Sequence, residues 1–234
     1  MIKSIEKEVQ RRGITRLCHF TSSRNLAYIL TESIGIRSTE DLRNDEHSIL
    51  NSTDLRRLDG HEGHICCSIQ YPNAWYLSKA MADEKLFKDW VILLIDCKYL
   101  WQSGTLFAPG NAATDRGGRI CDGLEGFLSL FADSVEGTRG RRYIRTPSHL
   151  LCCPTDNQAE VLIPERINIS DISAVVVRTE SQAWNEIVRL ELNGFIEQKP
   201  YFVIAPKLFD KSALKEAIST GKLVKETVLS RIEK

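Results

Sequence analysis

The sequence predicts a single α+β domain over residues 1–234, and three observations lead to that fold class. The 234 residues are 42% hydrophobic and 26% charged, as in ordinary globular domains, and a chain this long can bury a core without disulfides or metals. Helix-like and strand-like patterns alternate without the regular βαβ order of doubly wound folds. No linker, internal repeat or low-complexity tract divides the chain.

The first half of the chain predicts helices and strands in mixed order. Ile2, Ile5 and Val9 recur every three to four residues, which is typical of an amphipathic helix, and Gly13 ends it. The elements expected after it are a strand over 14–20, a helix from Ser22 or Ser23 through Leu30, a strand over 65–69, a helix over 74–89 and a buried strand over 90–96. The polar stretch 37–63 is expected to be a long functional loop that folds over a ligand.

The second half predicts fewer regular elements. Glycine-rich residues 102–126 are expected to be largely irregular, and residues 136–158 to form a surface loop. The regular elements expected are a short helix over 127–135, strands over 159–163, 173–177 and 201–205, a helix or a helix–strand mixture over 182–192 and a closing helix over 211–231.

Composition and termini predict a cytoplasmic protein without a membrane segment. Lys plus Arg and Asp plus Glu are 31 each, so the net charge is zero and a polybasic protein is excluded, although a local basic patch is not. The seven cysteines are odd in number and form no CxxC motif, which predicts free, mostly buried thiols. The N-terminus has no apolar signal region, and the longest apolar run, Val91–Ile95, is too short to span a bilayer.

The common catalytic motifs are absent from the sequence. It contains no GxxxxGK[ST], no strand-linked GxGxxG and no GxSxG. His61 and His64 stand near acidic residues in DGHEGH, but a solvated glycine-rich loop is favoured over a metal site, and no metal is expected. Cys152 and Cys153 lie near His149 without a group to orient a base, so a thiol nucleophile is not favoured.

Three segments stand out in sequence order. They are Cys18-His19-Phe20-Thr21 leading into Ser23-Arg24-Asn25-Leu26, then Arg56-Arg57-Leu58-Asp59-Gly60 before the strand over 65–69 and Tyr71-Pro72-Asn73, and finally Pro154-Thr155-Asp156-Asn157-Gln158-Ala159-Glu160-Val161-Leu162. In this order and at this spacing they resemble the DarT family of DNA ADP-ribosyltransferase toxins. Trp90–Asp96 and Asn111-Ala112-Ala113 add to the resemblance, which spans about residues 13–206.

The resemblance implies the ADP-ribosyltransferase fold, a split, twisted β core clasped by helices with NAD in the cleft. It implies transfer of ADP-ribose from NAD to a base of single-stranded DNA and a macrodomain antitoxin partner, DarG-like, that removes the mark. The thymine-modifying branch has an aromatic-rich strand after the NAD arginine, whereas here the strand is Ile65-Cys66-Cys67-Ser68-Ile69. The sequence therefore resembles the guanine-associated branch more, and guanine is the expected target base.

Two residues are expected to act in the reaction. Glu160 opens a strand after the TDNQAEVL loop segment, and a carboxylate there can stabilise an oxocarbenium-like sugar and take a proton from the base; its side chain is expected to be partly exposed. Arg57 is expected against the NAD pyrophosphate, with Arg56 as the alternative one residue away. An ion pair of Arg57 with Asp54 or Asp59 is the purely structural alternative.

The remaining NAD contacts are expected from the first segment. By resemblance, His19 and Thr21 line the NAD pocket, and Asn25, early in the following helix, hydrogen-bonds the adenosine part of NAD. A buried structural histidine and a polar residue at a helix start are the alternatives for His19 and Asn25.

DNA contacts are expected from an arginine-rich segment and the loop that follows it. Arg139, Arg141, Arg142 and Arg145 surround Tyr143 with no acidic residue among them, so the arginines can bind phosphates and the tyrosine can stack on an unpaired base. Gln158 can hydrogen-bond the edge of the acceptor base. A solvated charge run and an exposed loop amide are the alternatives.

Two other functions stay open at this point. The same fold and NAD chemistry could serve an RNA or protein acceptor, although a protein acceptor would not need the arginine run. Alternatively, the chain could be a nucleotide-binding module without chemistry, in which case Glu160 would be dispensable. Composition and periodicity alone lead only to a soluble α+β domain.

Overall fold

A computed structural model describes residues 2–31, 35–45, 57–137, 140–195 and 200–230 of the chain. Its helices, including short 3-10 turns (η), are α1 Ile2–Arg12, η1 Ser23–Asn25, α2 Leu26–Thr31, α3 Thr39–Asn44, α4 Ala74–Asp83, η2 Cys97–Trp101, η3 Thr114–Gly117, α5 Gly123–Ser129, η5 Ile169–Asp171, α6 Glu180–Leu192, η6 Pro206–Phe209 and α7 Lys211–Ser219. Its strands are β1 Arg16–Ser22, β2 Ile36–Arg37, β3 His64–Ile69, β4 Trp90–Asp96, β5 Leu106–Ala108, β6 Cys121–Asp122, β7 Ser134–Glu136, β8 Arg142–Ile144, β9 Glu160–Pro164, β10 Arg166–Ile167, β11 Ile172–Val177, β12 Tyr201–Ile204 and β13 Thr227–Val228.

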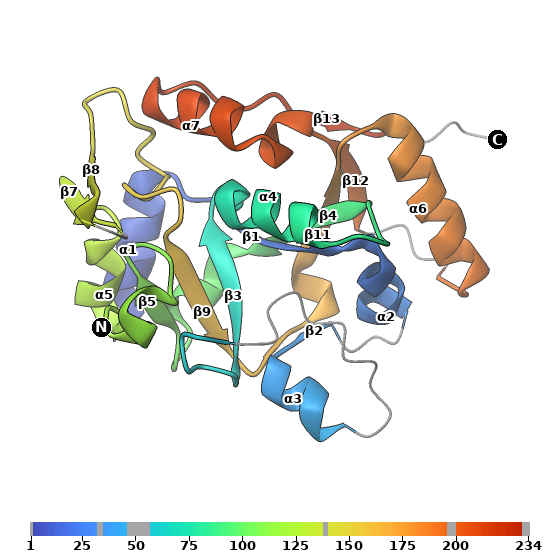
Figure 1. Ribbon diagram of the computed structural model, residues 1–234, viewed down its shortest axis with the longest axis horizontal. Coiled ribbons are helices and arrows are strands. Elements are labelled where there is room, and N and C mark those ends of the chain that lie inside the picture. Colours follow the sequence, from blue (N-terminus) through green and yellow to red (C-terminus); the bar gives the residue numbers. More distant parts are fainter. Residues whose placement is uncertain (1, 32–34, 46–56, 138–139, 196–199, 231–234) are drawn as a thin grey trace.

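Within the described ranges, one large sheet organises the molecule. Its strand order is β13-β12-β11-β4-β1-β3-β9-β5-β6, and β11 and β12 are its parallel pair. Figure 1 shows β1, β4 and β11 running across the view, while β3 and β9 run steeply down it. Helix α4 lies over the first group, and α1 and α5 lie beside β5 (Figure 1). This arrangement confirms the predicted α+β class and the strongly twisted sheet.

The two parts of the sheet meet at β1 and β3 and then separate. The β1–β3 register consists of Leu17 opposite Ile69 and Cys18 opposite Ser68. From His19 onward β1 continues along β4, whereas the start of β3, from His64 to Cys67, pairs with β9 instead. The sheet is therefore split beside His19, and side chains from both parts face the split.

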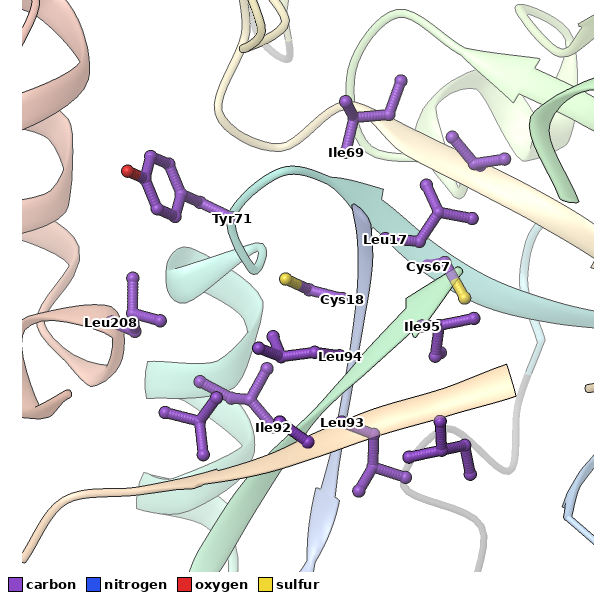
Figure 2. Packing of buried hydrophobic residues seen from close by; sticks show 14 of the residues in the cluster. Leu17, Cys18, Cys67, Ile69, Tyr71, Ile92, Leu93, Leu94, Ile95 and Leu208 are labelled. Atoms are coloured by element: carbon purple, nitrogen blue, oxygen red, sulfur yellow. The ribbon is translucent and has the colours of Figure 1, made fainter. Parts of the chain in front are cut away.

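The hydrophobic core runs through the centre of the sheet. β4 is buried from Trp90 to Ile95, which explains the unbroken apolar run in its sequence. Leu17, Cys18 and Tyr71 pack in the same cluster with β4, as Figure 2 shows. The split strands therefore rest on a rigid layer, which can hold functional side chains in place.

The predicted early elements are confirmed, with three differences in their bounds, the first being that the strand expected over 14–20 is β1, Arg16–Ser22. Helix α4 ends at Asp83 rather than at 89, because Glu84 turns extended and its carboxylate accepts the N–H groups of Leu86 and Phe87. The region expected to be a loop over 37–63 includes helix α3, capped by Ser38. Residues 46–56 of that region, with Arg56, lie outside the described residues.

Later boundaries differ more. The helix expected over 127–135 is wrong, since α5 covers 123–129 and residues 134–136 form β7. The expected surface loop over 136–158 contains β8, which pairs with β7 as a hairpin. The closing helix stops at Ser219, just before Gly221 with φ +73°, instead of reaching 231. The seven cysteines are free, as predicted. No helix in the described ranges has the length and apolar character to cross a membrane.

Candidate active site

His19 lies where β1 and β3 part. Its Nδ1 is 2.9 Å from the carbonyl oxygen of Cys66, so the imidazole spans the split that backbone pairing leaves. Burial lowers the pKa of His19, and the nearby positive charge of Arg57 lowers it further, although the Cys66 carbonyl opposes this shift. The ring is therefore neutral near pH 7, and it bridges the two parts of the sheet.

Glu160 opens β9 on the other side of the split. Asn73 Nδ2 donates to its Oε1 at 3.1 Å, and the backbone N–H of Ala112 donates to its Oε2 at 3.1 Å. The side chain is 7% exposed, so the expectation of partial exposure is wrong. The Glu160 carboxylate is covered by hydrogen-bond donors from two loops that are distant in the sequence. The spacing of residues in the sequence does not reveal that these loops lie together.

Arg57 is buried near the start of β3, where it donates to the His64 carbonyl, and it has a backbone φ of +38°. Its Nε and Nη2 donate to the two oxygens of Asp59 at 3.2 and 3.0 Å, and it also donates to the carbonyls of His61 and His64. Asp59, one of the two acidic partners named for an ion pair, does pair with Arg57, and the other, Asp54, lies outside the described residues. Burial raises the pKa of Asp59, but the hydrogen bonds from Arg57 and His61 more than offset it, so the carboxyl is ionised.

Cys66 connects these charged groups. Its Sγ lies 3.8 Å from Asp59 Oδ2, and the charges of Glu160 and Arg57 both act on it. Burial is the main reason that the pKa of the Cys66 thiol lies well above its usual value, so the thiol stays protonated. Three residues that the sequence predicts as functional therefore bear on Cys66: Arg57 and Glu160 act on its thiol through their charges, and His19 contacts its backbone carbonyl.

Thr21 and Asn25 lie further along β1 and in the turn after it. Asn25 Nδ2 donates to Thr21 Oγ1 at 2.8 Å, and Thr21 is buried. Turn η1 carries Asn25 back toward the strand that carries His19 and Thr21. The three residues expected to line the NAD pocket thus form one continuous segment on the β1 side of the split.

The loop before Glu160 is held by a buried carboxylate. Asp156 Oδ1 accepts the backbone N–H of Gln158 at 2.9 Å, and a Cβ at Gly110 would lie only 2.9 Å from Oδ2. Burial raises the pKa of Asp156 to about 6, although the Gln158 hydrogen bond opposes the shift. Gln158 itself is half-buried, four residues after Pro154 and two before Glu160.

The arginine-rich segment divides into two kinds of residue. Arg141 and Arg142 are exposed at the hairpin of β7 and β8, and Tyr143 is half-buried there. Arg145 instead donates to the carbonyls of Leu150 and Cys153, both at 2.8 Å. The Arg145 guanidinium therefore braces the following loop, and Arg139 lies outside the described residues.

Other groups noted in the sequence have structural partners. His61 Nδ1 lies 2.7 Å from the carbonyl of Asp59, and His64 Nε2 lies 3.2 Å from that of Gly104. His149 Nε2 lies 3.0 Å from the carbonyl of Pro154 rather than against a thiol. Among the described residues, no group of three His, Cys, Asp or Glu is placed to bind a metal ion.

Sequence reasoning missed Asn73, Asp59, Cys66 and Asp156 as members of the site. Asn73 follows Pro72, which signals a helix start, but nothing local shows that its amide reaches Glu160, 87 positions later. The sequence indicates Asp59 as an ion-pair partner and as a neighbour of His61 and His64, not as a member of this site. The useful signal is the position of each residue in or beside a segment that carries the resemblance: Asp59 two residues after Arg57, Cys66 in the strand that follows, and Asp156 four residues before Glu160.

The split sheet with a buried carboxylate beside it agrees with the ADP-ribosyltransferase fold that the sequence resemblance implies, and solved structures of that fold match this chain. The family profile described as "DarT: ssDNA thymidine ADP-ribosyltransferase, DarT" matches residues 18–209. The chain therefore belongs to the DarT family, whose description confirms the enzyme class predicted from the sequence, a single-stranded-DNA ADP-ribosyltransferase. The family profile does not confirm the guanine-associated branch. A comparison with curated protein sequences finds no match.

Solved structures of the family share this fold. Thermus sp. 2.9 DarT in complex with NAD⁺ has a TM-score of 0.54 at 13% identity, over 83% of this chain and 97% of that chain. The complex of the same protein with ADP-ribosylated single-stranded DNA has a TM-score of 0.53 at 12% identity, over 84% and 97%. Thermosipho africanus DarTG in complex with ADP-ribose has a TM-score of 0.56 at 15% identity, over 83% and 51%, so this chain spans about half of it.

Proposed function

We propose that this chain transfers ADP-ribose from NAD to a base of single-stranded DNA, with Glu160 as its catalytic carboxylate. The observation that carries the proposal is the position of Glu160, buried at the start of β9 beside the split and held by donors from two loops. A carboxylate oriented in this way can stabilise positive charge that develops in front of it. The NAD⁺ complex of Thermus DarT supports NAD as the donor substrate.

The reaction requires that the site release nicotinamide, stabilise the cationic sugar and accept a proton from the base. NAD supplies the ADP-ribose and a leaving group: its glycosidic C–N bond breaks, and nicotinamide departs with the bonding electrons. A nitrogen or oxygen of the base then forms the new bond to C1′ and loses a proton if it carried one. Glu160 stabilises the cationic sugar and accepts that proton, and the neutral His19 adds no charge that would oppose the cation.

The β1 side of the split is the proposed NAD side. Thr21 and Asn25 continue from His19 toward the adenosine end of the nucleotide. The NAD arginine is Arg57 in this proposal, with Arg56 as the alternative. Because the Arg57 guanidinium already donates to Asp59 and to two carbonyls, it acts through its charge and by holding the segment 57–64 against β3.

The acceptor strand approaches from the hairpin side in this proposal. Arg141 and Arg142, exposed on the hairpin, provide phosphate contacts, and Tyr143 and Gln158 provide contacts to bases; Arg139 is proposed with them. Arg145 supports this face by bracing the loop that leads to Glu160. An unpaired base needs no energy for extrusion from a duplex, which favours a single strand.

Guanine is the proposed target base, following the sequence of β3. The family description names thymidine, so the two bases are direct alternatives. We further propose a cytoplasmic toxin role with a DarG-like macrodomain antitoxin, which the Thermosipho DarTG structure supports. Removal of the ADP-ribose by such a partner would protect the cell that makes the enzyme.

Mass spectrometry of a mixed-sequence single-stranded oligonucleotide, incubated with the chain and NAD, tests the proposal. The expected result is a gain of one ADP-ribose unit, which falls at least about 100-fold in rate with Glu160→Ala. Glu191→Gln, at an exposed position of α6, is the matched control and leaves the rate unchanged. Fragmentation identifies the base. Nicotinamide release without a DNA product would redirect the acceptor to RNA or protein, and no release at all would favour the nucleotide-binding module.

A further inference from the structure

The side chain of Asn73 links helix α4 to the catalytic end of the split. It is 1% exposed and lies at the N-cap of α4, where its Oδ1 accepts the backbone N–H of Tyr76 at 3.0 Å. Its Nδ2 donates to Glu160 Oε1 at 3.1 Å. A residue at a helix start is thus also a hydrogen-bond donor to the proposed catalytic carboxylate.

The orientation of the amide follows from its partners. A backbone N–H can only donate, so the atom that faces Tyr76 must be the oxygen of the Asn73 amide. The NH₂ group is then the one that faces Glu160, and it can only donate. The helix cap therefore determines which end of the amide meets the carboxylate, and this end favours an ionised Glu160.

The backbone of Asn73 is held as well. Ser68 Oγ, on β3, accepts the backbone N–H of Asn73 at 3.0 Å, and Ser68 is also buried. The Asn73 side-chain amide and the Ala112 backbone N–H therefore both donate to the Glu160 carboxylate, and both come from segments far from Glu160 in the sequence. The Glu160 carboxylate is consequently oriented by two donors, of which Asn73 is itself held by hydrogen bonds to β3 and α4, and this is how a reacting group is held ready for a transition state.

We infer that Asn73 is a positioning residue of the transferase reaction, whose amide holds the Glu160 carboxylate in place beside the split through its hydrogen bond to Oε1. This inference rests on the proposed role of Glu160. It assigns Asn73 two separable functions, the cap of α4 and the donor to Glu160. A serine can replace the cap but is too short to replace the donor.

The test compares Asn73→Ser with Asn73→Ala, each measured by nicotinamide release and oligonucleotide modification across pH 4–9. Because both variants lose the donor, both are expected to lower kcat about ten-fold or more with a smaller change in KM for NAD. The pH of half-maximal rate on the acid side is expected to rise by about one unit in both. Thermal unfolding reports the cap, which Ser keeps and Ala loses.

Three results distinguish a positioning role of Asn73 from a helix cap alone and from failure of the proposed function. Wild-type kcat and an unshifted acid limb in Asn73→Ser would overturn the inference and leave Asn73 as a helix cap. Full activity of Glu160→Gln would overturn the proposed function instead, and the inference would fall with it. In the Glu160→Gln background, Asn73→Ser is expected to cause no further loss, because the group that it positions is gone.

Ser68→Ala gives a second measurement if Asn73→Ser fails to fold. It removes the acceptor that holds the Asn73 backbone without touching Glu160 directly. A smaller fall in kcat and a smaller shift of the acid limb in the same direction are expected. An unchanged profile in a folded Ser68→Ala protein would contradict the inference.

Discussion

The carboxylate end of the split and the arginine hairpin are built in opposite ways. Glu160 is 7% exposed and receives hydrogen bonds from Asn73 and Ala112, which lie 87 and 48 positions away. In the hairpin, β7 and β8 pair with each other as a separate two-stranded sheet, and Ile144 on it is 68% exposed. The first region is assembled by tertiary contacts, and the second by local ones.

The difference indicates where each region contributes. A buried group whose hydrogen bonds come from distant loops keeps one geometry, as a reacting centre requires. An exposed pair of arginines on a short hairpin can adapt to a flexible polymer, and its energy is electrostatic and screened by salt. Substitutions in the first region should therefore change rate or stability, and those in the second should change affinity.

The largest stability effect is expected at Arg57. Arg57→Lys keeps the charge but loses the planar fork that donates to Asp59, His61 and His64, so buried acceptors are left unpaired. We expect the free energy of unfolding to fall by about 2 kcal/mol or more, measured by urea denaturation. Arg119→Lys is the matched control, because Arg119 makes a more exposed ion pair with Asp115, and it should cost at most about 1 kcal/mol. Equal losses of unfolding free energy in Arg57→Lys and Arg119→Lys would contradict the prediction that the buried Arg57 contributes more to stability.

Asp156→Asn should change stability in a pH-dependent way. Burial raises the pKa of Asp156 to about 6, so the folded chain binds a proton that the unfolded chain releases near pH 4. Stability from this group is therefore present at low pH and lost as pH rises through about 6. At pH 8 the Asn variant should be more stable by about 1–3 kcal/mol, and the difference should vanish near pH 4. Asp133→Asn, at an exposed residue, should show no such dependence.

Arg145→Ala should lower stability and leave the electrostatics of DNA binding nearly unchanged. Its guanidinium donates to the carbonyls of Leu150 and Cys153, so removing it leaves the loop before Glu160 without that support. We expect a loss of about 1–3 kcal/mol in unfolding free energy. The dependence of DNA affinity on salt concentration is measured in the same variant. If its slope falls as much as in the Arg141→Ala and Arg142→Ala variant, Arg145 is instead a phosphate contact.

The smallest effect is expected from Arg141→Ala combined with Arg142→Ala. Both residues are exposed, so the unfolding free energy should stay within about 0.5 kcal/mol of wild type. The affinity for single-stranded DNA should fall several-fold, and the salt slope should flatten by about 1.4 if each arginine contacts one phosphate. Fluorescence anisotropy at several salt concentrations measures both. An unchanged slope would move the DNA path away from the hairpin.

Local patterns were enough to predict most of the regular elements. The buried run at Trp90–Asp96, the periodic apolar residues of α1 and the strand that Glu160 opens all appear close to their expected positions. Each depends on neighbours within about one turn or one strand. The expected helix over 127–135 failed because its residues are divided between α5 and β7, and the pairing partner of β7 lies beyond the segment itself.

The sequence by itself determined the α+β class and the free thiols, since these depend on composition and short-range spacing, and its resemblance to the DarT family is confirmed by the family profile. Only the tertiary structure decided that the sheet splits beside His19, that Arg57 pairs with Asp59 and that Asn73 meets Glu160. The physical reason is that a hydrogen bond between residues 87 positions apart depends on how the strands cross in space, and neither residue type nor spacing records that crossing.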